Sequence, residues 1–372
     1  MNRVCIVTAA RSEYGLLRWV IDGVHHNNDL QLQLVVTGTH LSEEHGMTAH
    51  FIEEDGYPIA ARVDMHLSFE NKSDIVRSMG YCSTGMAQAL ADLNPDIMVV
   101  LGDRYELLPI VSAAVVMGVP VAHISGGDVT EGAIDNQVRN AVTMMSSLHF
   151  PGTKPSYDNI CRMTGTDANV HVTGETNIDN FEHYQLLSRK ELSESLIINR
   201  NRRWVLVTLH PETKISLEAN LTMAHDLMFA LQSVDAEIVI TQANADFGGA
   251  QMNEIFKEAA TKNPSIHFIP TLGQMRYLSF MKEVECVIGN SSSGIVETPH
   301  LGAPTVNIGD RQKGRFFCSN IIPCDRSLSA IKESIDNAMN HGKYESNNYF
   351  GDGHASEIIV DTITKFLNNH SI

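Results

Sequence analysis

The sequence lacks any apolar run that approaches the roughly 20 residues of a membrane-spanning helix. Positive charge is also scarce: 27 Lys and Arg stand against 44 Asp and Glu, which gives a formal net charge of −17. This acidic balance argues against nucleic acid or an anionic membrane as a general partner. Any anion that the protein binds must therefore be held by a local cluster of residues.

Cysteine, histidine and glycine patterns exclude further classes. The six cysteines are scattered without a C-x-x-C pair, so we expect reduced thiols and a cytoplasmic protein. The chain starts with a strand-like run and no apolar leader, and we expect no secretion signal. The histidines show no two-His spacing with a carboxylate on one helix, which predicts no metal site. Residues 9–15 lack the three spaced glycines of a dinucleotide fingerprint, and no cofactor is expected.

Short β-rich runs alternate with amphipathic segments of helix length along 372 residues, which is long enough for two domains. The expected strands are residues 4–8, 32–37, 96–101, 120–124, 148–150, 204–209, 237–241, 266–269, 286–289 and 305–308. Continuous apolar strands separated by helices predict parallel sheets covered on both faces. The fold class is therefore α/β, with two doubly wound Rossmann-like domains. We place these at residues 1–176 and 177–353, with a last helix in 354–372 that could pack back on the N-terminal domain.

Polar residues follow these strands at the ends where such sheets bind ligands, beyond the carboxyl ends of the strands. This positional agreement carries more weight than any single motif. The residues that follow expected strands include Arg11, Asp103, Arg104, Ser125, Asp128, His210, Gln242, Asn244, Ser291, Ser292, Ser293 and Arg311.

Residues 289–297, a Ser- and Gly-rich turn ahead of a helix, are followed by a basic loop at 307–315. The turn offers backbone N–H groups, hydroxyls and the positive end of a helix to phosphate oxygens, and Arg311 supplies countercharge. Serine is also favoured at helix N-caps whether or not anything binds. The pattern indicates a nucleotide diphosphate site or a simple cap.

Acidic residues gather in two segments of the first half. Asp103 beside Arg104 can position a sugar hydroxyl or transfer a proton, or can be an N-cap with an incidental arginine. Asp128 and Asp135 lie in a glycine-rich stretch that could be only a turn, and Arg139 falls one helical turn beyond Asp135. The spacing predicts clustered acids for removal of a carbon-bound proton, and does not say which acid is the base.

The collected loops resemble those of the hydrolysing UDP-N-acetylglucosamine 2-epimerases of bacterial sialic and legionaminic acid biosynthesis. The resemblance spans nearly the whole chain. It is carried by residues 11–15, 101–106, 126–139, 210–213, 289–294 and 307–315. It implies a two-domain fold of the glycosyltransferase-B type with the substrate in the interdomain cleft. It also implies loss of the C2 proton and the nucleotide to give a glycal, followed by addition of water.

The resemblance also implies roles for particular residues. Asp103 and Asp135 match acids of proton transfer, with Asp128 and Arg139 beside them, and His210 matches a catalytic or phosphate-contacting residue. Nucleotide binding falls to Arg11, Gly15, Arg104, Gln242, Asn244, Ser291, Ser292, Ser293, Glu297 and Arg311. The chain departs from the family pattern in three places: Ser125 stands where some members carry an acid, and Asn140 and Met144 replace a His and a Lys.

We therefore expect an enzyme that converts UDP-N-acetylglucosamine and water to N-acetylmannosamine and UDP, and that assembles as a homodimer or homotetramer. A first alternative is the same reaction on UDP- or GDP-2,4-diacetamido-2,4,6-trideoxyglucose. Alternatives from other classes are a glycosyltransferase, which would leave the C2 hydrogen in place, and a sugar-nucleotide binding protein without turnover.

Overall fold

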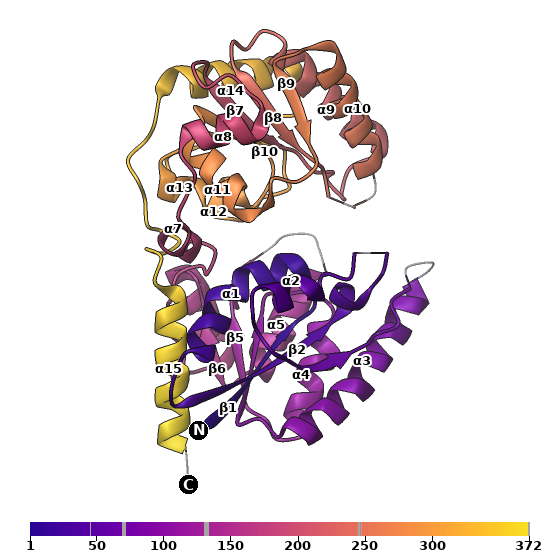
Figure 1. The fold of residues 1–372 in the computed structure, drawn as a ribbon, viewed down its shortest axis with the longest axis vertical. Helices are drawn as coiled ribbons and strands as arrows, with labels where there is room; N and C mark the ends of the chain where they lie inside the picture. The colour runs from indigo at the N-terminus through magenta and orange to yellow at the C-terminus, as the bar shows by residue number, and fades with distance from the viewer. Residues whose placement is uncertain (45, 69–71, 130–133, 245, 247, 371–372) are drawn as a thin grey trace. The chain divides into compact units, whose positions relative to one another are not determined.

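The computed structural model describes residues 1–44, 46–68, 72–129, 134–244, 246 and 248–370. The chain forms two compact units, one of Met1–Asn180 with Gly351–Ile372 and one of Phe181–Phe350 (Figure 1). The C-terminal helix α15 (Ala355–His370) thus belongs to the first unit. Among the residues just given, no helix is long and apolar enough to span a bilayer.

The first unit holds one parallel six-stranded sheet in the order β3-β2-β1-β4-β5-β6. Its strands are β1 (Asn2–Thr8), β2 (Leu30–Thr37), β3 (Ile59–Val63), β4 (Ile97–Leu101), β5 (Val121–Ile124) and β6 (Leu148–Phe150). Its helices are α1 (Arg11–His25), α2 (Ala49–Glu54), α3 (Lys72–Leu93), α4 (Leu107–Val116), α5 (Asp135–Met145) and α6 (Lys154–Thr164), with the 3₁₀ turn η1 (Gly38–Leu41).

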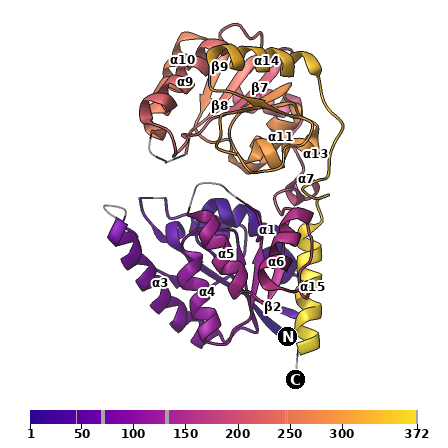
Figure 2. The same ribbon diagram turned by 180° about the vertical axis from the view of Figure 1, so that it is seen from behind.

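Alternate residues of the strands enter two separate cores, as the two-residue period of a strand requires. Val4 and Ile6 of β1 pack with α1 and α15 on one face. Cys5 and Val7 pack with α3, α4 and α5 on the other face. Figure 2 shows these three helices from behind. Both faces are therefore buried, which explains the unbroken apolar runs of the sequence.

The second unit repeats this plan, with a parallel six-stranded sheet in the order β12-β11-β10-β7-β8-β9. The strands are β7 (Trp204–Thr208), β8 (Glu237–Thr241), β9 (Ile266–Ile269), β10 (Cys286–Gly289), β11 (Thr305–Ile308) and β12 (Ile321–Cys324). The helices are α8 (Arg189–Leu196), α9 (Leu217–Leu231), α10 (Gly249–Lys262), α11 (Gly273–Glu283), α12 (Ser293–Val296), α13 (Thr298–Leu301) and α14 (Leu328–His341). The short helix α7 (Asp179–His183) begins in the last residues of the first unit and ends in the second.

In both sheets the strand order reverses direction at one place, between β1 and β4 in the first and between β7 and β10 in the second. The chain leaves these two strands toward opposite faces, so a crevice opens beyond their carboxyl ends. The loops after β1 and β4, and after β7 and β10, are thus the positions where ligands are expected.

Every strand expected from the sequence is present, and the structure adds two that were missed. Both lie at sheet edges. β3 includes Arg62 and is buried at its last residue only, and β12 contains Pro323, which a central strand does not tolerate. A pattern search for continuous apolar runs passes over such strands.

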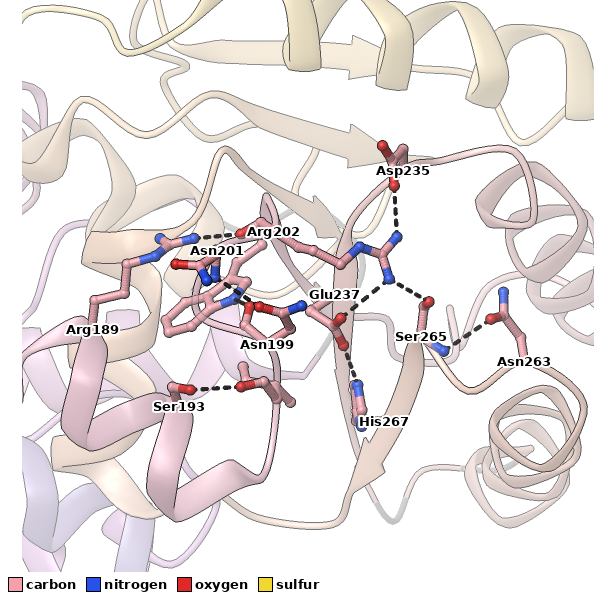
Figure 3. Close-up of polar contacts among 12 residues, drawn as sticks. Arg189, Ser193, Asn199, Asn201, Arg202, Asp235, Glu237, Asn263, Ser265 and His267 are labelled. Atoms are coloured by element: carbon pink, nitrogen blue, oxygen red, sulfur yellow. Dashed lines mark hydrogen bonds and ion pairs between the residues drawn. The ribbon is translucent and has the colours of Figure 1, made fainter.

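The amino edge of the second sheet is closed by a polar network (Figure 3). Arg202 donates to Asp235 at 2.7 Å, to Glu237 at 3.2 Å and to Ser265 at 2.7 Å. The second oxygen of Glu237 lies 2.7 Å from Nε2 of His267. These contacts tie the beginnings of β7, β8 and β9 together and leave the opposite, carboxyl edge for ligands.

Candidate functional site

Arg139 joins the two acidic segments of the first unit. Its guanidinium on α5 forms an ion pair with the carboxylate of Asp103, two residues beyond β4. It also donates to the backbone carbonyl of Asp128 at 2.8 Å. The Arg139 side chain is only 3% exposed and that of Asp103 is 29% exposed. The structure therefore brings together three of the residues that the sequence singled out, with Asp103 accessible at the edge.

Asp135, the first residue of α5, is affected by the charges of Asp103 and Arg139. Burial and the negative charge of Asp103 raise the pKa of Asp135, against the opposing effect of Arg139 and Arg104. Burial thus favours the protonated form of Asp135, while the Asp103 carboxylate is paired with Arg139, which suits one group for giving a proton and the other for taking it. The pair Asp103 and Asp135 can therefore perform acid–base chemistry.

Asp128 is held by structural contacts. The Ser156 hydroxyl, in the first turn of α6, donates to the Asp128 carboxylate, and Asn159 of the same helix donates to the Gly127 carbonyl at 2.9 Å. The loop after β5 is thus fastened to α6. A proton-transfer role for Asp128 stays a prediction.

Two buried glutamates near this edge were not identified as site residues from the sequence. Glu106 is fully buried and accepts from Arg104 at 2.5 Å. Glu13, in the first turn of α1, is 4% exposed and accepts from the Ala9 N–H at 2.5 Å. Both lie in the segments 11–15 and 101–106 that carry the family resemblance. Their burial near Arg104, which the sequence does not reveal, indicates that they balance the charge of Arg104.

Glu13→Gln is expected to stabilise the protein increasingly as the pH rises. Burial raises the pKa of Glu13 to about 7, so the folded chain binds more protons than the unfolded chain between about pH 4.5 and 7. The free energy of unfolding therefore falls through this window as the pH rises, because the buried carboxyl must ionise. Glutamine does not ionise, so the gain in stability of Glu13→Gln over wild type should be about 3 kcal/mol larger at pH 8 than at pH 4. Urea unfolding at both pH values measures this difference. The exposed Glu44→Gln is the control, and equal pH dependence of Glu13→Gln and wild type would contradict the prediction.

The two remaining candidates of the first unit lie on α1. Arg11 is exposed, and its guanidinium carbon lies 4.2 Å from the centre of the Phe51 ring. Gly15 is partly buried one turn further along the helix. Arg11 is therefore positioned by stacking and keeps its donors near the loop after β1.

At the reversal point of the second sheet, His210 and Asn290 connect the loops after β7 and β10. Asn290 accepts from the His210 N–H at 2.8 Å and donates to the His210 carbonyl at 2.9 Å. The backbone φ of Gly289 is +143°, and a Cβ added at this position would lie 2.0 Å from the Thr208 carbonyl oxygen. Only glycine allows β10 to come this close to β7.

His210 is neutral and its proton has a defined place. Nδ1 accepts from the Asn244 N–H at 3.1 Å, which assigns the ring proton to Nε2. Burial and the positive charge of Arg311 lower the pKa of His210 to about 4. The ring is therefore a hydrogen-bond donor suited to a phosphate oxygen, and its cationic form is absent near pH 7.

The serine turn opens a helix, as expected, but α12 has one turn only, so its positive end contributes little to binding of an anion. The N–H groups of Gly294, Ile295 and Glu297 are already bonded within this turn. Binding of a phosphate would then use the hydroxyls of Ser291, Ser292 and Ser293 and the nearby cations. Serine at such a turn remains compatible with both interpretations of the sequence.

A partly buried tyrosine that the sequence gave no reason to select adjoins this turn. The Tyr277 hydroxyl on α11 lies 3.2 Å from Thr208, which is 2.9 Å from Thr241. Burial raises the pKa of Tyr277 to about 12, and hydrogen bonds with Thr208, Ser293 and Ser291 act against this. A chain of hydroxyls therefore connects the ends of β7 and β8 with the serine turn.

The other nucleotide-binding candidates lie along the same edge. Arg311 donates to the Asn290 carbonyl at 3.1 Å, and Glu297 is 8% exposed just after α12. Gln242 is exposed immediately after β8, and Asn244 is fixed by its contact with His210. The structure thus gathers these residues of the second unit around the ends of β7, β8 and β10.

Comparison with known proteins identifies the class. A family model described as UDP-N-acetylglucosamine 2-epimerase matches residues 22–364, and the chain belongs to this family. The chain is 34% identical to GDP/UDP-N,N'-diacetylbacillosamine 2-epimerase (hydrolyzing) of Campylobacter jejuni. The match extends over 337 residues, which are 90% of this chain and 87% of the relative. It is 28% identical to the UDP-N,N'-diacetylbacillosamine 2-epimerase (hydrolyzing) of Legionella pneumophila, over 96% of this chain and 94% of that protein.

Among solved structures, UDP-GlcNAc 2-epimerase from Neisseria meningitidis bound to UDP-GlcNAc is similar with a TM-score of 0.81. The identity is 19%, and the match covers 98% of this chain and 100% of that one. The predicted fold, two doubly wound Rossmann-like domains of the glycosyltransferase-B type, is confirmed. The prediction of an enzyme, a hydrolysing nucleotide-sugar 2-epimerase, is confirmed as well.

Proposed function

We propose that the protein hydrolyses a nucleoside-diphosphate 2-acetamido sugar and inverts the configuration at C2, releasing the free epimer and the nucleoside diphosphate. The observation that carries this proposal is the pair of acids Asp103 and Asp135: Asp103 is paired with Arg139, and the charges of both Asp103 and Arg139 act on Asp135. Removal of a carbon-bound proton and its return to the opposite face require two acid–base groups, and we assign these roles to the two acids.

The reaction proceeds in two stages. One acid takes the C2 proton while the bond from C1 to the nucleotide breaks, which leaves a double bond between C1 and C2. The other acid then returns a proton to C2 from the opposite face, and water adds at C1. The raised pKa of Asp135 favours its protonated form and suits it to return the proton, and the Asp103 carboxylate beside Arg139 suits the role of base.

Similarity favours a diacetamido sugar as the substrate. The relatives that are 34% and 28% identical are named for N,N'-diacetylbacillosamine, and we place the UDP or GDP derivative of this sugar first. UDP-N-acetylglucosamine, expected from the sequence, is the second candidate. It is favoured by the 25% identity to UDP-N-acetylglucosamine 2-epimerase of Neisseria meningitidis and the 30% identity to polysialic acid biosynthesis protein P7 of Escherichia coli. The product would serve legionaminic or sialic acid synthesis, made by a homodimer or homotetramer.

A panel of UDP- and GDP-linked 2-acetamido and 2,4-diacetamido sugars tests this function. Each is incubated in D₂O with the enzyme, and the products are identified by NMR. We expect release of the nucleoside diphosphate, a free sugar inverted at C2 and one deuterium at C2. A free sugar that keeps its C2 hydrogen with every substrate would exclude the mechanism.

Arg311→Ala is expected to weaken UDP binding by roughly ten- to a hundredfold, because one charge-assisted contact to phosphate contributes about 1.5–3 kcal/mol. Calorimetric titration with UDP measures the affinity. The matched control is Arg203→Ala, since Arg203 also donates to a backbone carbonyl, that of Met339, but at the amino edge of the same sheet. Equal affinities of the two variants would remove Arg311 from the binding site.

A further inference from the structure

Ser125 has an unusual backbone at the carboxyl edge of the first sheet. It is the residue directly after β5, and its φ of +58° is in the left-handed region that residues with a Cβ rarely adopt. Its N–H donates to the Phe150 carbonyl at 3.0 Å, which fixes it against the end of β6. On the other side, the Gly102 N–H donates to the Ile124 carbonyl at 3.0 Å. Ser125 and Asp103 therefore follow the ends of two hydrogen-bonded strands.

A carboxylate from a distant segment is held on this serine. The Ser125 hydroxyl donates to Oε2 of Glu175 at 2.9 Å, fifty residues further along the chain. Glu175 lies flat against the backbone of Gly152, where a Cβ would come within 2.0 Å of Oε1. The missing side chain at position 152 makes the space that the carboxylate occupies.

The direction of this hydrogen bond decides what the serine can do. An ionised carboxylate only accepts, so the hydroxyl proton of Ser125 points to Glu175 and the oxygen lone pairs are left for other partners. Such a hydroxyl can take a proton from an O–H group while it gives its own to the carboxylate. The proton that Ser125 takes is therefore expected to come from a water molecule. A serine hydroxyl is too weak a base to remove a proton from a C–H bond.

The neighbouring acids already have other partners. Asp103 is paired with Arg139, and the carboxylate of Asp128 accepts from Ser156. Glu175 is the carboxylate that reaches the end of β5 through a hydroxyl. The pair Ser125 and Glu175 is thus distinct from the acids that carry the chemistry at C2.

We propose that Ser125 and Glu175 form a proton relay that activates the water in the second stage of the reaction. This inference rests on the proposed function. The water oxygen bonds to C1 while the C1–C2 double-bond electrons take a proton at C2 from the acid that holds one. The water gives its proton to the Ser125 oxygen, and the Ser125 proton passes to Glu175. Ser125 contacts the reacting water, and Glu175 acts through it as a positioning and proton-accepting residue.

Glu175→Gln separates the two stages, because glutamine keeps an acceptor for Ser125 but cannot take its proton. In single-turnover time courses we expect nucleoside diphosphate to be released at the wild-type rate. Free epimer should form at least about tenfold more slowly, and a sugar with a C1–C2 double bond should accumulate and be visible by NMR. Ser125→Ala should do the same, and the double variant should be no slower than either single one.

Glu191→Gln is the matched control. Ser188 donates to Glu191 at 2.7 Å in the N-cap of α8, so the same pair is changed at a place without a role in the reaction. Wild-type formation of epimer by Glu175→Gln, or equal slowing of both stages without an unsaturated sugar, would overturn the relay alone. If the unmodified enzyme releases no nucleoside diphosphate from any substrate of the panel, the proposed function fails, and the relay fails with it.

Discussion

Asp103→Asn is expected to lower kcat by about 10²- to 10⁴-fold, the usual contribution of one acid–base group, while the affinity for UDP is unchanged. Asparagine has nearly the same shape but cannot exchange a proton, and it leaves the buried guanidinium of Arg139 without its countercharge. The pKa of Asp135 is raised first by burial and then by the charge of Asp103, and loss of that charge removes the second effect. We therefore expect the pH profile of the remaining activity to shift to lower pH.

The measurement is steady-state turnover across pH, with UDP affinity determined by calorimetry. Asp158→Asn is the control, because it makes the same chemical change at a distance from the two acids. Asp158 forms an exposed ion pair with Lys154 at 2.7 Å on α6. Asp135→Asn should be as damaging as Asp103→Asn. Wild-type turnover by either of these two variants would remove that residue from the proton transfers.

Glu212→Ala is expected to destabilise the second unit by about 3 kcal/mol. Glu212 is 4% exposed and accepts two hydrogen bonds from Arg326, at 3.0 and 2.7 Å. It also accepts from the Asp310 N–H at 3.2 Å, and Gly309, with a φ of +76°, leaves the room for its carboxylate. The figure is at the low end for a buried pair because the Arg326 side chain is 32% exposed and regains water.

Urea unfolding measures this loss, and UDP titration should show weaker binding as well, because Glu212 connects the loop of His210 with the loop of Arg311. Glu258→Ala is the control: its bond with Lys262 joins two exposed side chains on α10, and such pairs contribute little to stability. An unfolding free energy of Glu212→Ala within the range of this control would show that the buried pair does not stabilise the unit.

The sequence predicts the strands well because each is buried on both faces and is therefore apolar throughout. β3 and β12 escape this pattern, since edge strands need fewer apolar residues. Asp103 and Asp128 could be assigned to one edge because both follow parallel strands, and Arg139 could be added by its helical spacing from Asp135. The structure joins Asp103 and Asp128 through Arg139. The catalytic and binding roles themselves stay predictions.

What the sequence could not supply is contact between distant residues. Glu175 stands in a segment that interrupts the periodicity and resembles a linker, yet its carboxylate lies on Ser125. Glu13 and Tyr277 are ordinary helix residues in the pattern, and only tertiary packing brings them beside charged or hydroxyl groups. Burial and long-range pairing are properties of the fold and have no local signature.

The position of α15 has a consequence for how the chain acquires its structure. The helix begins on Asp179, whose carboxylate accepts from the N–H groups of Ala355 and Ser356 at 3.0 and 2.6 Å. Its residues Ile359 and Ile363 complete the core that β1 and α1 begin. During synthesis the whole second unit emerges before this last piece, so it can fold while the first unit still exposes an apolar face. The part of the protein that carries the acids is therefore the first to be made and the last to be finished.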